Sequence, residues 1–361
     1  MKSTPLYENH KKLNCKFTEF AGYQMPVSYG AIKDEALAVR NQCGIFDVSH
    51  MLPISLKGNH ADLIAELNRV TVRSVEKIKP GKVQYNALYN EKGGLIDDIT
   101  ISHIPTQGNE SHFLIVANAG NRDADLAHLR KYLSAEKIRI EPWENYTLLA
   151  LQGPKAESFL KNYFPAASEL FYYECVQIAE HQFIARTGYT GEDGFEIITP
   201  TSMGADLFDK LIAAGVKPCG LAARDILRLE ALMPLYGHEL SVDLRPQESG
   251  IEFIYEDKNS IATSAIRNAA VQYKTLGFSL GGEGVPRQGY KIVTSDGNEA
   301  GVVTSGGFSF VLDKGFGFMR VLRSALSAPL FIEIRGEKKP ITVQEKSFIQ
   351  GSVKRRPKSA K

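Results

Sequence analysis

Residues 277–310 read GFSLGGEGVPRQGYKIVTSDGNEAGVVTSGGFSF, a succession of short β-rich runs divided by Gly, Pro and Asp-Gly turns. The pattern continues to residue 345, and the full set of predicted strands is Gly277–Leu280, Tyr290–Thr294, Gly301–Thr304, Phe316–Val321, Leu330–Ile334 and Ile341–Glu345. Short strands at nearly regular spacing are typical of a small antiparallel barrel or sandwich. We therefore expect the end of the chain to form an all-β domain.

Upstream of this region, helical and strand patterns are mixed. Apolar residues at helical spacing predict helices at Lys33–Gln42, His60–Val70, Arg122–Leu133, Pro154–Tyr163, Ala205–Ala214 and Ala222–Leu232. Runs of β-forming residues predict strands at Val83–Tyr89, Leu95–Ile104, Phe113–Ala117 and Leu148–Leu151. Asn121 and Ser202 are predicted to cap the helices that follow them. The order lacks the regular repeat of a parallel sheet, which favours an α+β fold.

The composition is that of a soluble globular protein, with 43% hydrophobic and 23% charged residues among 361. This length suggests two or three domains. A net charge of +2 predicts neither nucleic acid nor a membrane surface as a partner, and no apolar stretch is long enough to span a bilayer. The basic residues near the end are expected to form a solvated tail: Lys354, Arg355, Arg356, Lys358 and Lys361.

The cysteines and histidines show no metal-binding spacing. The four cysteines, at positions 15, 43, 175 and 219, form no CxxC pair, which is typical of free and mostly buried thiols in a reducing compartment. The eight histidines include no HExxH motif, so no metal is expected. The N-terminus lacks the apolar run of a secretory signal, so we expect a cytoplasmic protein.

The first chemical candidate is the segment EKGGLIDD, residues 91–98. Gly93 and Gly94 form a turn signal between two strand patterns and predict a β-hairpin. Alternation along the second strand places Asp97 and Asp98 on opposite faces, one toward the interior or a cleft and the other toward solvent. The pair is either a set of carboxylates at a strand end or a carboxylate held in a partly dry cleft, where it can move a proton.

The second candidate is RTGYTGEDGFE, residues 186–196. It is not a phosphate loop, because no Lys-Ser/Thr follows its glycines and a strand rather than a helix comes next. A strand–turn–strand loop would let Tyr189 and Glu196 approach a planar ligand, and a carboxylate can accept two parallel N–H bonds from such a ligand. A Gly-rich hairpin without a ligand is the alternative.

The third candidate is the helix GLAARDILRLE, residues 220–230. Arg224 and Arg228 are four residues apart and share a face. Surface ion pairing is the usual role of such charges. An arginine at the start of the helix can instead orient an acidic group of a ligand.

Together these segments resemble the T protein of the glycine cleavage system, the aminomethyltransferase family. The similar stretches run in order over nearly the whole chain: Thr4-Pro-Leu-Tyr7, Phe20-Ala-Gly-Tyr-Gln-Met-Pro-Val27, Gly44-Ile-Phe-Asp-Val-Ser-His-Met51, Gly93–Asp98, Val116-Ala-Asn-Ala-Gly120, Leu149-Ala-Leu-Gln-Gly-Pro154, Thr187–Glu196, Gly220–Glu230, Leu235-Tyr-Gly-His-Glu-Leu240 and Val303-Thr-Ser-Gly306.

The resemblance implies a three-domain cloverleaf around a central folate cavity, with a C-terminal antiparallel β-barrel. The implied domains are 1–50 with 143–170 and 220–262, then 51–142 with 171–219, and lastly 263–361. The implied reaction moves the methylene of the aminomethyl group from the dihydrolipoyl arm of the H protein to tetrahydrofolate. It releases ammonia and gives 5,10-methylenetetrahydrofolate. A monomer without a metal is expected, with the lipoylated H protein as its partner.

The resemblance also implies roles for single residues. Asp98 matches the catalytic carboxylate, near the folate N10 atom, and Glu196 matches the glutamate that binds the pterin. Arg224 matches an arginine that contacts the ligand, and the remaining residues expected to line the folate cavity are Asn118, Tyr85 and Tyr189.

The chain departs from the family pattern in three places. Ile251-Glu-Phe-Ile254 stands where Trp is usual, Asp257–Ile266 lacks a Phe-Ile-Gly core, and Lys346-Ser-Phe-Ile-Gln-Gly lacks the Pro and Tyr that follow the Phe. These changes concern the floor of the folate site and the C-terminal contacts.

Two alternatives stay open: a standalone folate-dependent demethylase and a non-catalytic folate-binding protein of the same fold. Flavin-linked demethylases need a dinucleotide domain for which 361 residues leave no room. Iron–sulfur assembly relatives carry Lys-Gly-Cys-Tyr where this chain has Arg186-Thr-Gly-Tyr189.

Overall fold

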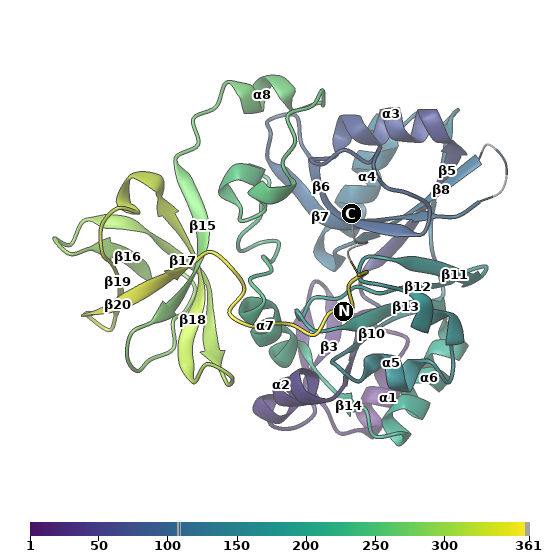
Figure 1. The fold of residues 1–361 in the computed structure, drawn as a ribbon, viewed down its shortest axis with the longest axis horizontal. Helices are drawn as coiled ribbons and strands as arrows, with labels where there is room; N and C mark the ends of the chain where they lie inside the picture. The colour runs from purple at the N-terminus through teal and green to yellow at the C-terminus, as the bar shows by residue number, and fades with distance from the viewer. Residues whose placement is uncertain (107, 109, 358–361) are drawn as a thin grey trace.

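The structure is a computed structural model that describes residues 1–106, 108 and 110–357. Its strands form a three-stranded sheet, a six-stranded sheet, a five-stranded sheet and a closed six-stranded barrel. Figure 1 shows the barrel as a lobe on one side of the molecule, with the two large sheets on the other side. The mixed α+β class is therefore confirmed.

The first 220 residues contain a three-stranded sheet and a six-stranded sheet. The three-stranded sheet contains β1 (Lys2–Ser3), β3 (Tyr23–Ser28) and β2 (Lys16–Phe20), and its neighbouring helices are α1 (Tyr7–Lys12) and α2 (Ile32–Asn41). The six-stranded sheet runs in the order β11 (Cys175–Ala179), β12 (Gln182–Ala185), β13 (Gly194–Pro200), β10 (Tyr146–Gln152), β4 (Gly44–Asp47) and β14 (Lys217–Pro218). The helices that follow its strands are α5 (Ala156–Leu160), α6 (Thr201–Ala213) and α7 (Leu221–Glu230).

Strand β10 explains why this sheet is stable. Leu149 and Leu151 pack in one hydrophobic core with Phe208 and Leu211 of α6. Leu148, one position along, belongs to a second core on the other face. A strand covered on both faces has a continuous apolar sequence, which is the pattern that predicted it.

The five-stranded sheet contains β6 (Lys82–Tyr89), β7 (Leu95–Ile104), β8 (Glu110–Ala117), β5 (Leu52–Asn59) and β9 (Ile138–Pro142), in that order. Helices α3 (His60–Val70) and α4 (Arg122–Tyr132) pack on it through Leu63, Leu67 and Leu129. Strands β6 and β7 form the predicted hairpin. Gly93 in its turn has φ +85°, a conformation that favours glycine.

The C-terminal barrel runs in the order β15 (Tyr273–Leu280), β18 (Lys314–Leu322), β17 (Glu299–Ser309), β16 (Lys291–Thr294), β19 (Leu330–Ile334) and β20 (Glu337–Gln344), and α8 (Thr263–Arg267) precedes it. All its neighbouring strands pair antiparallel. Phe278, Val303 and Met319 are among the residues that fill its interior. The predicted C-terminal antiparallel barrel is confirmed.

Strand pairing divides the chain differently from the predicted domains. The predicted second domain joins residues 171–219 to 51–142, yet β12 pairs with β13, and β13 pairs with β10 and through it with β4. We therefore propose that residues 175–219 belong with the first domain. The other limits stay predictions.

Two predicted helix caps are wrong. Asn121 precedes α4, but its side chain makes no capping bond and donates instead to Asp97. Ser202 lies inside α6, which begins at Thr201. The start of each helix and the partner of its first side chain depend on buried acceptors and on neighbouring strands, which the local sequence does not reveal.

The C-terminal segment after β20 returns across the molecule instead of forming a solvated tail. Lys354 donates to Glu157 (2.9 Å), and Arg356 donates to Glu174 (2.7 Å). The prediction of a solvated tail is therefore wrong for Lys354, which is partly buried, whereas Arg355 and Arg356 are exposed. Lys358 and Lys361 lie outside the described residues. The four cysteines are free thiols, of which Cys43, Cys175 and Cys219 are buried, as predicted.

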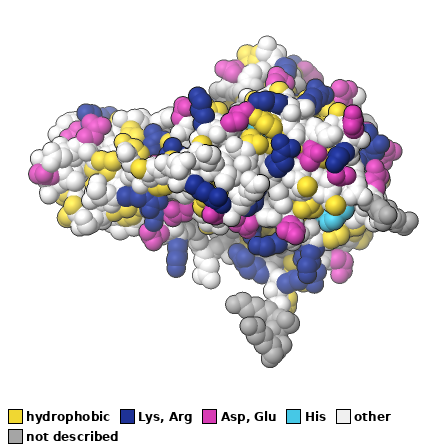
Figure 2. All heavy atoms as spheres, turned by 90° about the horizontal axis from the view of Figure 1, so that it is seen from above, with side chains coloured by type: hydrophobic (Ala, Val, Ile, Leu, Met, Phe, Trp, Pro, Cys, Tyr) yellow, Lys and Arg dark blue, Asp and Glu magenta, His cyan; other side chains and the backbone are white. Residues whose placement is uncertain are grey.

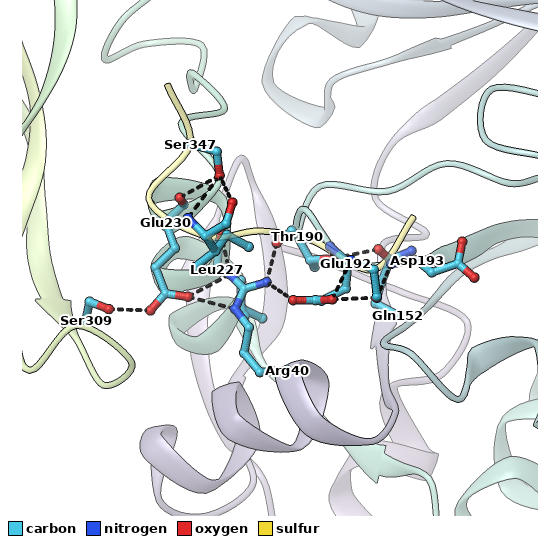
Figure 3. Close-up of polar contacts among 11 residues, drawn as sticks. Arg40, Gln152, Thr190, Glu192, Asp193, Leu227, Glu230, Ser309 and Ser347 are labelled. Carbon is cyan, nitrogen blue, oxygen red and sulfur yellow. Dashed lines mark hydrogen bonds and ion pairs between the residues drawn. The ribbon is translucent and has the colours of Figure 1, made fainter. Parts of the chain in front are cut away.

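Figure 3 shows Ser347 of the returning segment beside Glu230, in a network of polar contacts that also includes Ser309 and Glu192. Glu230, the last residue of α7, accepts a hydrogen bond from Ser309 of the barrel (2.6 Å). Its backbone carbonyl accepts one from Ser347 (3.2 Å). Glu192, in the 186–193 loop, accepts one from the backbone N–H of Ser352 (3.1 Å). Residues 346–357, here called the C-terminal strap, therefore connect the barrel, α7 and this loop.

Candidate active site

A cavity of about 900 Å³ lies between the five-stranded sheet, the six-stranded sheet and α7. The six residues proposed from the sequence all line it: Tyr85, Asp98, Asn118, Tyr189, Glu196 and Arg224. They come from β6, β7, the end of β8, the 186–193 loop, β13 and α7. All the residues that line it fall between Thr18 and Phe253, so none comes from the barrel, which contacts α7 through Ser305 and Arg228.

Asp98 faces this cavity with neutral hydrogen-bond donors around it. The hydroxyl group of Tyr85 donates to Oδ2 (2.9 Å), and the side-chain amide of Asn118 donates to Oδ1 (2.9 Å). Burial, followed by the negative charge of Asp97, raises the pKa of Asp98 to about 7. A carboxyl group with a pKa near neutrality can both accept and donate a proton at physiological pH.

Asp97 points away from the cavity and is completely buried. The expectation that one of the two aspartates faces solvent is wrong, because α4 covers this face of the strand. The backbone N–H of Asn118 donates to Asp97 Oδ2 (2.8 Å), and the side chains of Asn118 (2.9 Å) and Asn121 (2.6 Å) donate to Oδ1.

Glu196 and Arg224 lie on the opposite wall. The hydroxyl of Thr187 donates to Oε2 of Glu196 (2.6 Å). The guanidinium of Arg224 lies 4.9 Å from the centre of the Tyr189 ring, and its Nη1 atom is buried without a hydrogen-bond partner in the described structure. Burial lowers the pKa of Arg224, and the charge of Glu196 opposes that shift. An unpartnered guanidinium N–H inside a cavity indicates a ligand acceptor.

Aromatic rings give the cavity flat surfaces. The rings of Tyr85 and Phe253 are stacked, with centroids 6.2 Å apart and an angle of 15° between their planes. The Tyr189 hydroxyl donates to the carbonyl of Pro234, which fixes the ring that Arg224 covers. A planar heterocycle fits between such surfaces.

The altered segment at Ile251–Ile254 still completes a hydrophobic core. Ile251 and Ile254 are buried with Tyr89, Leu95 and other residues of one cluster. Phe253, between them, is 71% exposed and lines the cavity. The departure from the family pattern therefore leaves this wall of the cavity formed.

His50 and Arg228 are among the cavity residues that sequence reasoning missed. His50 has a buried Nδ1 atom without a partner in the described structure, and burial lowers its pKa to about 4. It lies in a stretch that resembles the family, yet no spacing singled it out. Arg228 was expected at the surface but is 1% exposed and binds Glu239 (3.0 Å) and Ser305 of the barrel (2.8 Å). Ser305 lies far from Arg228 in the sequence, so the local pattern could not predict this contact.

Two further findings concern other classes of site. Within residues 1–106, 108 and 110–357, no three His, Cys, Asp or Glu side chains are arranged to hold a metal ion. The helices of the same residues are too short or too polar to cross a bilayer. Figure 2 shows acidic and basic side chains interspersed over the face viewed from above.

Known proteins resemble this chain along its whole length. Residues 6–258 match the GCVT N-terminal domain, and residues 274–350 match the glycine cleavage T-protein C-terminal barrel domain. The aminomethyltransferase of Leptospira biflexa is 39% identical over 98% of this chain and 99% of its own length. That of Aquifex aeolicus is 38% identical over 96% of this chain and 95% of its own length.

A solved structure agrees with the sequence comparisons. The glycine cleavage system aminomethyltransferase T of Bartonella henselae is 32% identical and has a TM-score of 0.91. The match covers 98% of this chain and 99% of that one. The mixed fold with its C-terminal barrel is thus that of a T protein. The chain belongs to the glycine cleavage T-protein family, the family of the aminomethyltransferases.

Proposed function

We propose that the cavity transfers the methylene of an aminomethyl group, carried on the dihydrolipoyl arm of a lipoylated H protein, to tetrahydrofolate. The products are ammonia and 5,10-methylenetetrahydrofolate. The observation that supports this proposal best is Asp98, a carboxyl group that faces the cavity, is held only by neutral donors and has a pKa near 7. The bound tetrahydrofolate supplies the nucleophilic nitrogen atoms.

Asp98 is the proposed catalytic residue. Held by Tyr85 and Asn118, its carboxyl group stays at one position on the cavity wall. There it can exchange a proton with a nitrogen of the ligand while charge develops on that nitrogen. The cavity also brings the ligand and the lipoyl arm together, and this positioning supplies a large part of the rate gain.

The opposite wall is the proposed pterin site. The carboxylate of Glu196 can accept two parallel N–H bonds from the edge of the pterin. The unpartnered Nη1 of Arg224 offers a donor to a ligand oxygen. Tyr85, Tyr189 and Asn118 complete the lining, and the stacked Tyr85 and Phe253 rings offer a flat surface.

The decisive experiment compares wild type with Asp98→Asn in an assay with aminomethyl-loaded H protein and tetrahydrofolate. We expect folate-dependent ammonia release that falls at least about a hundredfold in the variant, the effect of losing a general acid–base group. Full activity of Asp98→Asn would contradict the catalytic role.

The same assay separates the alternatives. Folate binding without ammonia release in the wild type would favour a non-catalytic folate-binding protein. Methyl transfer from a small methylated compound to tetrahydrofolate, and no methylene transfer from the H protein, would favour a standalone demethylase. A cytoplasmic monomer that meets the H protein transiently completes the proposal, and sedimentation tests the oligomeric state.

A further inference from the structure

Asp125 on α4 is a buried carboxyl group for which the described residues provide neither a hydrogen-bond donor nor a cation. It is completely buried, and neither of its oxygen atoms has a hydrogen-bond partner in the described part of the chain. Its neighbour is Asp97, which is also completely buried. Among the described residues, no Lys, Arg or His lies within salt-bridge distance of either group.

Two adjacent buried carboxylates cannot both be ionised. Removing each charge from water costs several kcal/mol, and the repulsion of the second charge adds to it. Asp97 accepts three hydrogen bonds from Asn118 and Asn121, and these favour its ionised form. Asp125 accepts none. The proton therefore belongs on Asp125, whose O–H can donate to Asp97, and both burial and the charge of Asp97 raise the pKa of Asp125.

Asp97 is connected to the catalytic carboxyl group through Asn118. The Nδ2 atom of Asn118 lies 2.9 Å from Oδ1 of Asp97 and 2.9 Å from Oδ1 of Asp98. The charge on Asp97 therefore acts on Asp98 across one shared amide group. The other titratable groups that interact with these carboxyls are Tyr85 from β6, Tyr189 from the 186–193 loop and Tyr236 after α7. Their pKa values are raised, so they stay neutral near pH 7.

We propose that Asp125 is a positioning residue that keeps one proton between itself and Asp97, so that the pair carries a single negative charge beneath Asp98. This charge holds Asp98 partly protonated at neutral pH. The inference about Asp98 rests on the proposed function, whereas the shared proton does not.

The proton itself is tested without substrate. A carboxyl group whose pKa is higher in the folded protein than in the unfolded chain keeps its proton on folding. The protein therefore loses stability as the pH rises above about 4, where the same group ionises in the unfolded chain. Asp125→Asn removes this titration and keeps an N–H that can donate to Asp97. We expect the melting temperature of Asp125→Asn, relative to wild type, to rise steadily from pH 5 to pH 8. A difference that does not depend on pH would overturn the proposal.

The matched control is Asp123→Asn, which removes an exposed carboxylate from the same turn of α4. Its melting temperature relative to wild type should show no such rise. If it follows the trend of Asp125→Asn, the trend reports the charge of the helix and the proposal fails.

The effect on Asp98 is read from the pH dependence of methylene transfer. Asp125→Ala removes one of the donors that favour ionised Asp97, so the pKa of Asp97 rises and Asp97 loses part of its negative charge near neutral pH. The acid limb of the pH–rate profile should then move to lower pH in Asp125→Ala and keep its position in Asp125→Asn. Equal positions in both variants would overturn the coupling. Loss of activity in Asp98→Asn tests the proposed function separately.

Discussion

Arg40 of α2 and Glu230 of α7 form a buried ion pair in which Nη2 lies 2.6 Å from Oε2. The side chain of Arg40 is only 6% exposed, and all five of its N–H groups have acceptors (Figure 3). They are Glu230 twice, Glu192, and the carbonyls of Thr190 and Leu227. One arginine thus holds α7 and the 186–193 loop, two of the walls of the cavity, in a fixed relation.

Replacing Arg40 should therefore destabilise the protein strongly. Arg40→Met keeps most of the volume but leaves Glu192 and Glu230 as buried charges without a cation. We expect the free energy of unfolding to fall by about 3–5 kcal/mol, as measured by denaturant unfolding followed by circular dichroism. Lys11→Met, which breaks an exposed ion pair with Glu8, should leave the unfolding curve unchanged. An unchanged curve for Arg40→Met would show that this network does not hold the two walls.

Tyr85→Phe tests how Asp98 is tuned. The Tyr85 hydroxyl donates to Asp98 and so favours the ionised carboxylate, which lowers its pKa. Without that bond the pKa of Asp98 rises, and the acid limb of the pH–rate profile should move to higher pH. The measurement is methylene transfer between pH 5 and pH 9. Tyr163→Phe, at an exposed position, is the control. If the acid limb stays in place, the ionisation of Asp98 is not what determines it.

Glu196→Ala tests the pterin site. The loss of charge-assisted hydrogen bonds, each worth about 1.5–3 kcal/mol, should raise the Kd of tetrahydrofolate at least about tenfold. Calorimetry measures this directly. Glu180→Ala, which removes an exposed carboxylate, should leave the Kd unchanged. Unchanged affinity in Glu196→Ala would refute the role of this residue.

Local sequence patterns predicted the regular elements well. Helix His60–Val70 and strand Leu95–Ile104 have the bounds that the sequence predicted, since the apolar residues of each face a core along their full length. The barrel followed from turn residues at regular spacing. Which strands share a sheet could not be predicted as well. The strand β10 that pairs with β13 lies far away in the sequence, and only packing selects it.

The site could be predicted only in part. Single motifs suggested a functional role for Asp98, Tyr189, Glu196 and Arg224 only beside a purely structural alternative, and the ordered resemblance over the whole chain selected all six cavity residues. Asp125 carried no signal, because an aspartate in the first turn of a helix is ordinarily an exposed group that favours the helix dipole. Arg228 likewise has the sequence context of a surface charge, and its burial depends on barrel residues that follow it by about 80 positions.

Gly351→Ala tests whether the C-terminal strap supports the cavity. A Cβ atom at Gly351 would lie 1.7 Å from the carbonyl oxygen of Gly191, in the loop that carries Tyr189, so the strap and the loop must separate. Overpacking of this kind costs about 1–3 kcal/mol. We therefore expect a lower melting temperature and a higher Kd for tetrahydrofolate, because the loop loses its bonds from Ser352.

Gly30→Ala is the matched control, since a Cβ there meets no atom within 4 Å. It should change neither quantity. If Gly351→Ala lowers the melting temperature and leaves the Kd unchanged, the strap stabilises the fold without shaping the site. A rise in the Kd would instead mean that the end of the chain, through Ser352 and Glu192, holds the loop that presents Tyr189 to the ligand.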